Sequence, residues 1–185
     1  MKRFLSIVIY LSSFIVVLLG CSEVKQEDLQ TKQIVTEGDF IYRLVTEESE
    51  YKENGPIRLI AELEYVGDKE EVLISHAASP FSFSMVETTR DYEISYPMAE
   101  PEIETVIRKG KPLRKAYTGG AGAYSAEDKK NYVTFIQKIM KKEFPNGHYI
   151  VNGLASYTVL ENEETGQEKD YNLKARVEFR VKSSN

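Results

Sequence analysis

The chain has 185 residues, of which 24 are basic and 29 acidic, so its formal net charge at pH 7 is −5. Hydrophobic residues make up 42% of the chain and aromatic residues 11%, a composition that excludes an intrinsically disordered protein. The acidic excess argues against a nucleic-acid partner, because binding to phosphates needs a basic surface.

The first twenty residues have the layout of an export signal. Lys2 and Arg3 form a short basic region, and the apolar run 4–19 is shorter than the roughly 20 residues that a membrane-spanning helix needs. The run leads into Leu18-Leu19-Gly20-Cys21, and Cys21 is the only cysteine of the chain. This ending resembles the lipobox of bacterial lipoproteins, including poorly characterised ones from Bacillus-type bacteria.

The lipobox resemblance implies a location for the protein. In bacterial lipoproteins the chain is cut before the cysteine, whose sulfur carries a thioether-linked diacylglycerol. A signal peptide over residues 1–20 and a diacylglyceryl group on Cys21 would hold the protein on the extracytoplasmic face of the cell membrane. Without Lys2 and Arg3, 22 basic residues remain against 29 acidic ones, so the lipid rather than charge must provide the anchor. An uncleaved transmembrane anchor with a free thiol is the alternative.

A polar stretch follows the cysteine. Residues 22–38 contain four scattered apolar residues and no dense periodicity, which predicts a flexible tether over residues 21–38. A short helix is the alternative for this stretch. The remainder, residues 39–185, has the size of one domain with its own core, and we expect it to be a monomer.

Alternating apolar and polar residues predict that this domain is mainly β. In the segment 171–181 every second residue is apolar, which is typical of a strand with one buried and one solvated face. Similar patterns between turn residues predict further strands at 40–45, 57–65, 72–76, 81–86, 92–96, 104–108, 113–117 and 148–160. Gly153 predicts a bulge or bend in the last of these. The whole predicts an antiparallel β-sandwich.

One segment departs from the alternation. From Tyr132 to Phe144 apolar residues recur every three or four positions, which predicts an amphipathic helix near residues 126–143 with Ser125 as its cap. The other face is rich in lysine: Lys129, Lys130, Lys138, Lys141 and Lys142. These lysines either only keep the helix soluble or contact an anionic wall polymer or lipid. In a third interpretation the apolar stripe docks a partner.

The order of strands and turns is similar to that of a known family. The strand 57–65, the turn Gly67-Asp68, the strand 81–86, residues 109–113, the segment 144–149 (FPNGHY) and the final strand resemble the intracellular proteinase inhibitor (BsuPI-like) family. This resemblance implies an immunoglobulin-like sandwich, into which this chain inserts one helix. It also implies protease inhibition through an exposed loop, for which 97–102 and 119–124 are candidates. The chain departs from that family in its export signal and in the inserted residues 119–143.

Catalytic and metal-binding patterns are weak in the sequence. His76 and His148 lie far apart, and we interpret both as structural residues. There is no Gly-x-Ser-x-Gly motif, no His/Cys cluster for zinc, and no calcium-loop spacing in the acidic segment 161–170. We therefore predict no catalytic residue, no cofactor and no metal, and an enzyme is the least favoured class.

Several groups of residues are candidate binding surfaces. The glycines of the loop before the helix could favour anions, and the tyrosines would form an aromatic platform if they are exposed rather than in the core. Three of the helix lysines add positive charge. The candidate residues are Tyr92, Tyr96, Gly119, Gly120, Gly122, Tyr124, Lys129, Lys138 and Lys142.

A shorter acidic series is a further candidate. Glu100, Glu102 and Glu104 alternate around Pro101 and could present acids along a strand edge, although the prolines more simply protect such an edge from aggregation. The prediction as a whole is a membrane-tethered, non-catalytic binding or structural module. Its expected partners are a cell-wall polymer or another envelope protein, and an exported protease inhibitor is the alternative.

Overall fold

The computed structural model describes residues 28–162 and 166–183. The predicted signal peptide and Cys21 lie outside the described residues. The described part contains one helix, α1 (Lys130–Met140), and eleven strands: β1 (Lys32–Glu37), β2 (Phe40–Thr46), β3 (Glu50–Lys52), β4 (Leu59–Tyr65), β5 (Glu71–His76), β6 (Phe81–Glu87), β7 (Tyr92–Ile94), β8 (Ile103–Arg108), β9 (Leu113–Ala116), β10 (Gly147–Asn162) and β11 (Gln167–Lys182).

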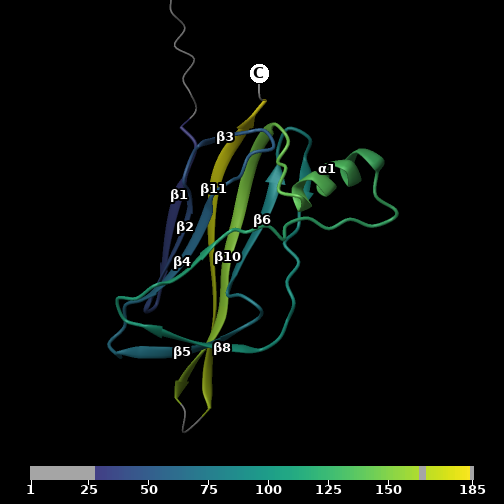
Figure 1. Ribbon diagram of the computed structural model, residues 1–185. Helices are drawn as coiled ribbons and strands as arrows, with labels where there is room; N and C mark the ends of the chain where they lie inside the picture. Colours follow the sequence, from purple (N-terminus) through teal and green to yellow (C-terminus); the bar gives the residue numbers. More distant parts are fainter. Residues whose placement is uncertain (1–27, 163–165, 184–185) are drawn as a thin grey trace, which may run out of the picture.

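These strands form two sheets that pack face to face (Figure 1). Sheet A has the order β1-β2-β4-β9. Sheet B has the order β3-β11-β10-β5-β8, with β6 paired to β10 and β7 paired to β6. The strands pair antiparallel except for β3, which runs parallel to β11. The prediction of a mainly β sandwich with one helix is therefore confirmed.

The core consists of alternate residues from both sheets. In β11 every odd-numbered residue from Tyr171 to Val181 is buried, and the even-numbered residues are more exposed. This confirms the predicted alternation of one buried and one solvated face. Aromatic rings fill much of the space between the sheets, and Tyr149 stacks on Phe179 with ring centroids 5.1 Å apart. Rings of this size remove large apolar areas from water, so they dominate the packing energy.

The folded domain begins earlier than the sequence indicates. Residues 32–37, predicted to belong to a flexible tether, form β1 and pair with β2 over its whole length. Just before β1, the carbonyl of Gln30 accepts a hydrogen bond from the N–H of Glu178 at 2.8 Å. The apolar signal is weak here because Ile34 is 50% exposed and only Val35 packs against the core. The folded part therefore begins near Gln30 and not at residue 39.

The helix is shorter than predicted. It spans 11 residues, begins at Lys130, and has no side-chain hydrogen bond at its N-terminus. Ser125 lies in a separate turn before the helix, where its N–H donates to the carboxylate of Asp128. This local bond competes with helix capping, as is common for serine and aspartate. Among the described residues, no helix is both long and apolar enough to cross a membrane.

Gly153 does not form the predicted bulge. It stays in register with Ala175 of β11 and Phe83 of β6. A Cβ atom at this position would lie 2.7 Å from the hydroxyl oxygen of Tyr42 and 2.7 Å from Cδ2 of Leu44, both on the opposite sheet. Glycine is needed here because the two sheets approach each other closely.

Strand β10 changes its neighbour partway along its length. From Tyr149 to Ala155 it pairs with β6, whereas Thr158 and Val159 pair with β5. The chain passes from β5 to β6 through residues 77–80 at this point, and the carbonyl of Pro80 accepts a hydrogen bond from Ser156. The change of partner leaves the outer face of sheet B uneven, and the candidate site lies there.

Candidate functional site

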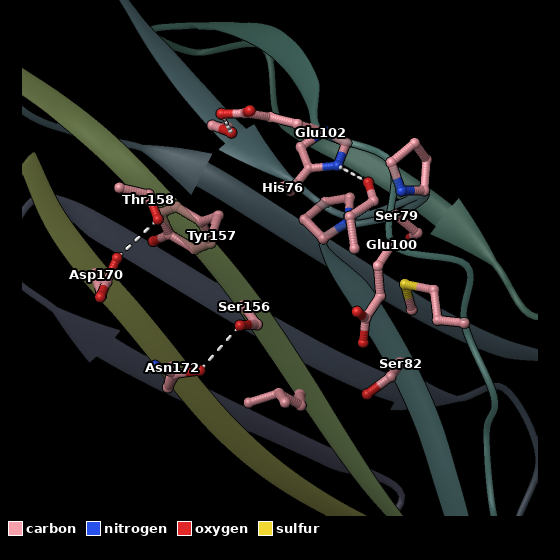
Figure 2. A pocket seen from close by; sticks show the side chains of 16 residues that line it. His76, Ser79, Ser82, Glu100, Glu102, Ser156, Tyr157, Thr158, Asp170 and Asn172 are labelled. Atoms are coloured by element: carbon pink, nitrogen blue, oxygen red, sulfur yellow. Dashed lines mark hydrogen bonds between the residues drawn. The ribbon is translucent and has the colours of Figure 1, made fainter.

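A hollow of about 580 Å³ lies on the outer face of sheet B, where β10 stops pairing with β6 and begins to pair with β5 (Figure 2). Its volume lies in the range typical of ligand pockets, about 300–1,000 Å³. The loop between β7 and β8 forms one wall, and a hydrogen bond of 3.2 Å from the N–H of Ala78 to the carbonyl of Ala99 fixes that loop. We call this hollow the outer-face pocket.

The floor of the outer-face pocket is polar because it is built from outward-facing residues of three strands. Two cross-strand hydrogen bonds connect β10 to β11 on this floor: Ser156 donates to Asn172 at 2.9 Å, and Thr158 donates to Asp170 at 2.7 Å. Such pairs fix the position of their polar groups. Leu154 adds an apolar contact surface beside them.

Carboxylates surround the pocket. Glu102 accepts a hydrogen bond from the hydroxyl of Ser75 at 3.1 Å. Glu100 has no hydrogen bond or ion pair with any described residue, and Figure 2 shows its carboxylate pointing towards the part of the pocket that Ser82 lines. Together with Asp170, these acids give the pocket a negative potential, which attracts a cationic group.

The two histidines are already engaged in structural bonds. His76 lines the pocket, with Nδ1 2.6 Å from the carbonyl oxygen of Ala77 and Nε2 2.8 Å from the hydroxyl of Thr105. His148 contacts the carboxylate of Glu178 at 3.0 Å. Within residues 28–162 and 166–183, no three His, Cys, Asp or Glu side chains are grouped so that they could hold a metal ion. The pocket offers hydrogen-bonding groups and charge for binding.

A second hollow, of about 520 Å³, adjoins the first on the same face, since Ser82 and Leu154 line both. Lys174 and Arg176 of β11 bring positive charge to it, and Lys174 forms no ion pair with a described residue. Gln33 of β1 lines its margin and accepts a hydrogen bond from the N–H of Arg176. The two hollows together form the outer-face groove, which is acidic at one end and basic at the other.

The length of the outer-face groove restricts what it can hold. Along β10 the groove runs from Asn152 to Thr158, which corresponds to about 20 Å of strand. An extended chain of about six residues has the same length. Serine, threonine and asparagine side chains on the floor can bond to backbone groups of such a chain, and the opposite charges at the two ends can select its direction.

Of the two interpretations of the tyrosines, the structure favours packing in the core over an exposed platform. Tyr92 and Tyr96 are half-buried at the edge of the core, where Tyr92 packs on Phe135 with ring centroids 5.2 Å apart and Tyr96 packs on Phe83 at 5.7 Å. Tyr124 alone of the three is exposed, at 45%. Aromatic residues at such spacing serve packing here, because the end of the sandwich needs apolar cover beneath α1.

The glycine-rich loop lies beneath α1 instead of forming an open anion site. Gly119 and Gly122 are buried, with φ of +106° and +96°. A Cβ atom on Gly122 would lie 3.0 Å from Cγ2 of Ile136, and one on Gly119 would lie 2.7 Å from Cε of Lys142. The N–H of Gly122 donates to the carbonyl of Ser95 at 2.7 Å, so it is not available to a ligand.

The remaining predicted residues are accessible. Gly120, Lys129, Lys138 and Lys142 are exposed around α1, away from the outer-face groove. Of the acidic series, Glu100 and Glu102 line the outer-face pocket, and Glu104 does not.

Sequence reasoning missed the groove floor. Its residues come from β6, β10 and β11, whose pairing is set by contacts between distant segments. The alternation of polar residues in each strand was the only available signal. It predicts which residues of a strand face outwards, but it does not predict which strands lie side by side.

Comparison with known proteins gives no relative. No protein-family model matches the chain, and neither a curated protein nor a solved structure matches it significantly. The lipobox and the similarity to the intracellular proteinase inhibitor family therefore stay predictions from the sequence.

Proposed function

We propose that the chain is a lipoprotein on the extracytoplasmic face of the cell membrane, held by a diacylglyceryl group on Cys21. In this proposal it is a monomeric, non-catalytic binding module with an immunoglobulin-like sandwich, and it uses neither cofactor nor metal. The lipobox supports the anchoring, and the resemblance of the strand order to an immunoglobulin-like family supports the finer fold assignment.

The outer-face groove is the observation that carries the binding function. It combines hydrogen-bonding side chains, an apolar contact at Leu154, and two charged groups without partners among the described residues, Glu100 and Lys174. Unpaired charges at opposite ends of a hollow favour a ligand with complementary charges. The ligand is an extended peptide segment of an envelope protein, basic at the Glu100 end and acidic at the Lys174 end.

A blocking substitution tests this function. Peptides of about six residues, with lysine or arginine at one end and glutamate or aspartate at the other, are displayed as a library and selected on the lipidated protein in detergent. Selected peptides are then synthesised, and their dissociation constants are measured by fluorescence anisotropy. Leu154→Arg places a long side chain on the floor shared by both hollows, so we expect affinity to fall at least about tenfold, as for the loss of a central contact.

Val86→Arg is the matched control. Val86 is also a half-buried apolar residue on the outer face of sheet B, on β6, but it lines neither hollow. Affinity should be unchanged in this variant. Glu100→Lys should weaken binding of a peptide whose basic end lies there, and the loss should diminish in high salt. Selected peptides that bind Leu154→Arg as well as the wild type would contradict a function at the groove.

A further inference from the structure

The shortened tether restricts how the domain can face a membrane. Among the described residues, the earliest main-chain hydrogen bond to the folded part is made by Gln30, nine residues after Cys21. Nine residues span at most about 30 Å when fully extended. The β1–β2 turn lies at the far end of β1, which has six residues and is about 20 Å long, and the β10–β11 hairpin projects beyond that turn (Figure 1). A chain anchored at Cys21 therefore enters the domain at the end where β1 begins, and only a nearly extended tether running along β1 would bring the far end to the bilayer.

Helix α1 lies at the anchored end. Lys32 at the start of β1 pairs with Val45 near the end of β2, and the neighbouring strands place Ile60 and Ala116 at the same end of sheet A. After Ala116 the chain enters the loop that leads to α1. Figure 1 shows the start of β1, β3 and α1 towards one end of the sandwich, while the β10–β11 hairpin projects beyond the other end.

The surface around α1 carries more lysines than acids. Five lysines are exposed on α1 and beside it, Lys129, Lys130, Lys138, Lys141 and Lys142, against three exposed acids, Glu127, Asp128 and Glu143. None of the five lysines forms an ion pair with a residue that the structure describes, so their charge is free for a partner. Met140 lies among them and is 52% exposed, although it belongs to the apolar stripe of the helix.

The opposite end is acidic. The end of β1, the β1–β2 turn and the β4–β5 turn carry four exposed acids, Glu37, Asp39, Asp68 and Glu70, and one exposed lysine, Lys69. An anionic surface repels these acids, and it attracts lysines only within a Debye length of about 10 Å. Charge and tether length thus favour the same orientation, with the α1 end at the membrane.

We propose that the α1 end of the sandwich rests on anionic lipid headgroups of the membrane that holds the anchor, with the five lysines at the headgroups and Met140 among them. This inference rests on the proposed anchoring through Cys21. It commits the lysine surface to lipid and not to wall polymer, because the short tether keeps that surface beside the bilayer. The outer-face groove, which follows β10, then stands away from the membrane and stays accessible.

An introduced thiol can report this orientation. Cys21 is the only cysteine of the chain, and its sulfur is consumed by the thioether, so Met140→Cys provides a single reactive thiol. The full lipidated protein is labelled with a fluorophore at this position and reconstituted into vesicles of phosphatidylcholine with or without phosphatidylglycerol. A quencher attached to the lipid headgroups measures contact. Lys69→Cys, in the exposed β4–β5 turn at the opposite end, is the matched control.

The proposal predicts strong quenching at position 140 and weak quenching at position 69. Quenching at position 140 should require phosphatidylglycerol and should fade as salt is added. Reversing Lys129, Lys138 and Lys142 to glutamate should reduce it about tenfold, because each lysine near the surface contributes to the attraction. Equal quenching at both positions, or equal quenching in neutral and anionic vesicles, would overturn the proposal.

The controls separate this inference from the anchoring itself. If the protein stays on the vesicles after an alkaline wash but position 140 is not quenched, only the orientation is wrong. If the alkaline wash removes the protein, the anchoring is wrong and the orientation falls with it. Salt-sensitive binding of the lysine surface to purified wall polymer, with no response to anionic vesicles, would assign the lysines to the polymer and contradict the proposal.

Discussion

Glu87 is a fully buried carboxylate at the turn between β6 and β7. Its oxygens accept hydrogen bonds from the N–H of Thr89 at 2.9 Å, and from the N–H and guanidinium of Arg90, both at 3.0 Å. Burial alone would raise the pKa of Glu87, but these bonds and the charge of Arg90 outweigh burial and hold the pKa below its ordinary value of 4.5. The charged form therefore stabilises the fold.

The pH dependence of unfolding checks this role. Because the folded-state pKa is depressed, the stabilisation is fully present above pH 4.5 and is lost as the pH falls through the folded value. Glu87→Gln should lower the free energy of unfolding by about 1–3 kcal/mol at neutral pH. It should also flatten the decline below pH 4.5, measured by denaturant titration. Glu93→Gln, at an exposed carboxylate of the same region, should match the wild type.

In contrast to the carboxylate of Glu87, the buried hydroxyl of Tyr42 has no hydrogen-bond partner among the described residues. Burial raises the pKa of this hydroxyl. An unsatisfied buried hydroxyl destabilises a fold, so Tyr42→Phe should leave the free energy of unfolding unchanged or raise it by up to about 1 kcal/mol. Chemical denaturation measures the change. A loss of more than 1 kcal/mol would show that the hydroxyl is satisfied in solution.

Among the secondary-structure elements, strands with a strong alternation of apolar and polar residues could be predicted from the sequence. The segment 171–181 has six apolar residues facing one way, and all of them are buried in β11. β1 was missed because it lies at an edge and contributes one packed apolar side chain, Val35. β3 was missed because it has only three residues and is defined by its pairing with β11. Elements held by pairing rather than burial leave little trace in hydrophobic periodicity.

The register of β11 predicts contrasting effects of neighbouring substitutions. Phe179 is buried against Tyr51, Phe144 and Tyr149, so Phe179→Ala should cost about 3–5 kcal/mol of unfolding free energy. Lys174 lies on the exposed face of β11. Lys174→Ala should therefore change the free energy of unfolding by less than about 0.5 kcal/mol. Thermal and denaturant unfolding measure both. Equal losses would be incompatible with the register described here.

Hydrogen exchange distinguishes β1 from a tether. Since residues 32–37 pair with β2 along their whole length, the amides that bond to β2 should exchange far more slowly than those of an unstructured peptide. Mass spectrometry of peptides covering residues 28–46 resolves this. Exchange at the rate of an unstructured chain throughout 32–37 would support the tether predicted from the sequence over the strand found in the structure.

At the scale of the whole molecule, the candidate site was less predictable than the fold. The groove joins segments that are about 90 residues apart, such as Ser82 and Asn172, and their proximity depends on β10 lying between β6 and β11. The sequence did single out Glu100 and Glu102, which line the groove. It also offered, as possible binding residues, tyrosines and glycines that the structure uses to pack α1 onto the end of the sandwich. Composition alone cannot separate packing from binding.

The proposed orientation involves the anchor, the helix and the groove together. A lipid on Cys21, a short tether and the lysines around α1 would place one end of the sandwich at the membrane, and the groove would stay accessible to a partner from the envelope side. The proposed function therefore depends on the anchoring through Cys21.

Mass spectrometry of the protein purified from its membrane tests the anchoring directly. We predict a mature chain that begins at Cys21 and carries the added mass of a thioether-linked diacylglycerol, and a Cys21→Ser variant that keeps residues 1–20 and gains no lipid. A chain that retains Met1, or one cut at another position with an unmodified Cys21, would contradict the account.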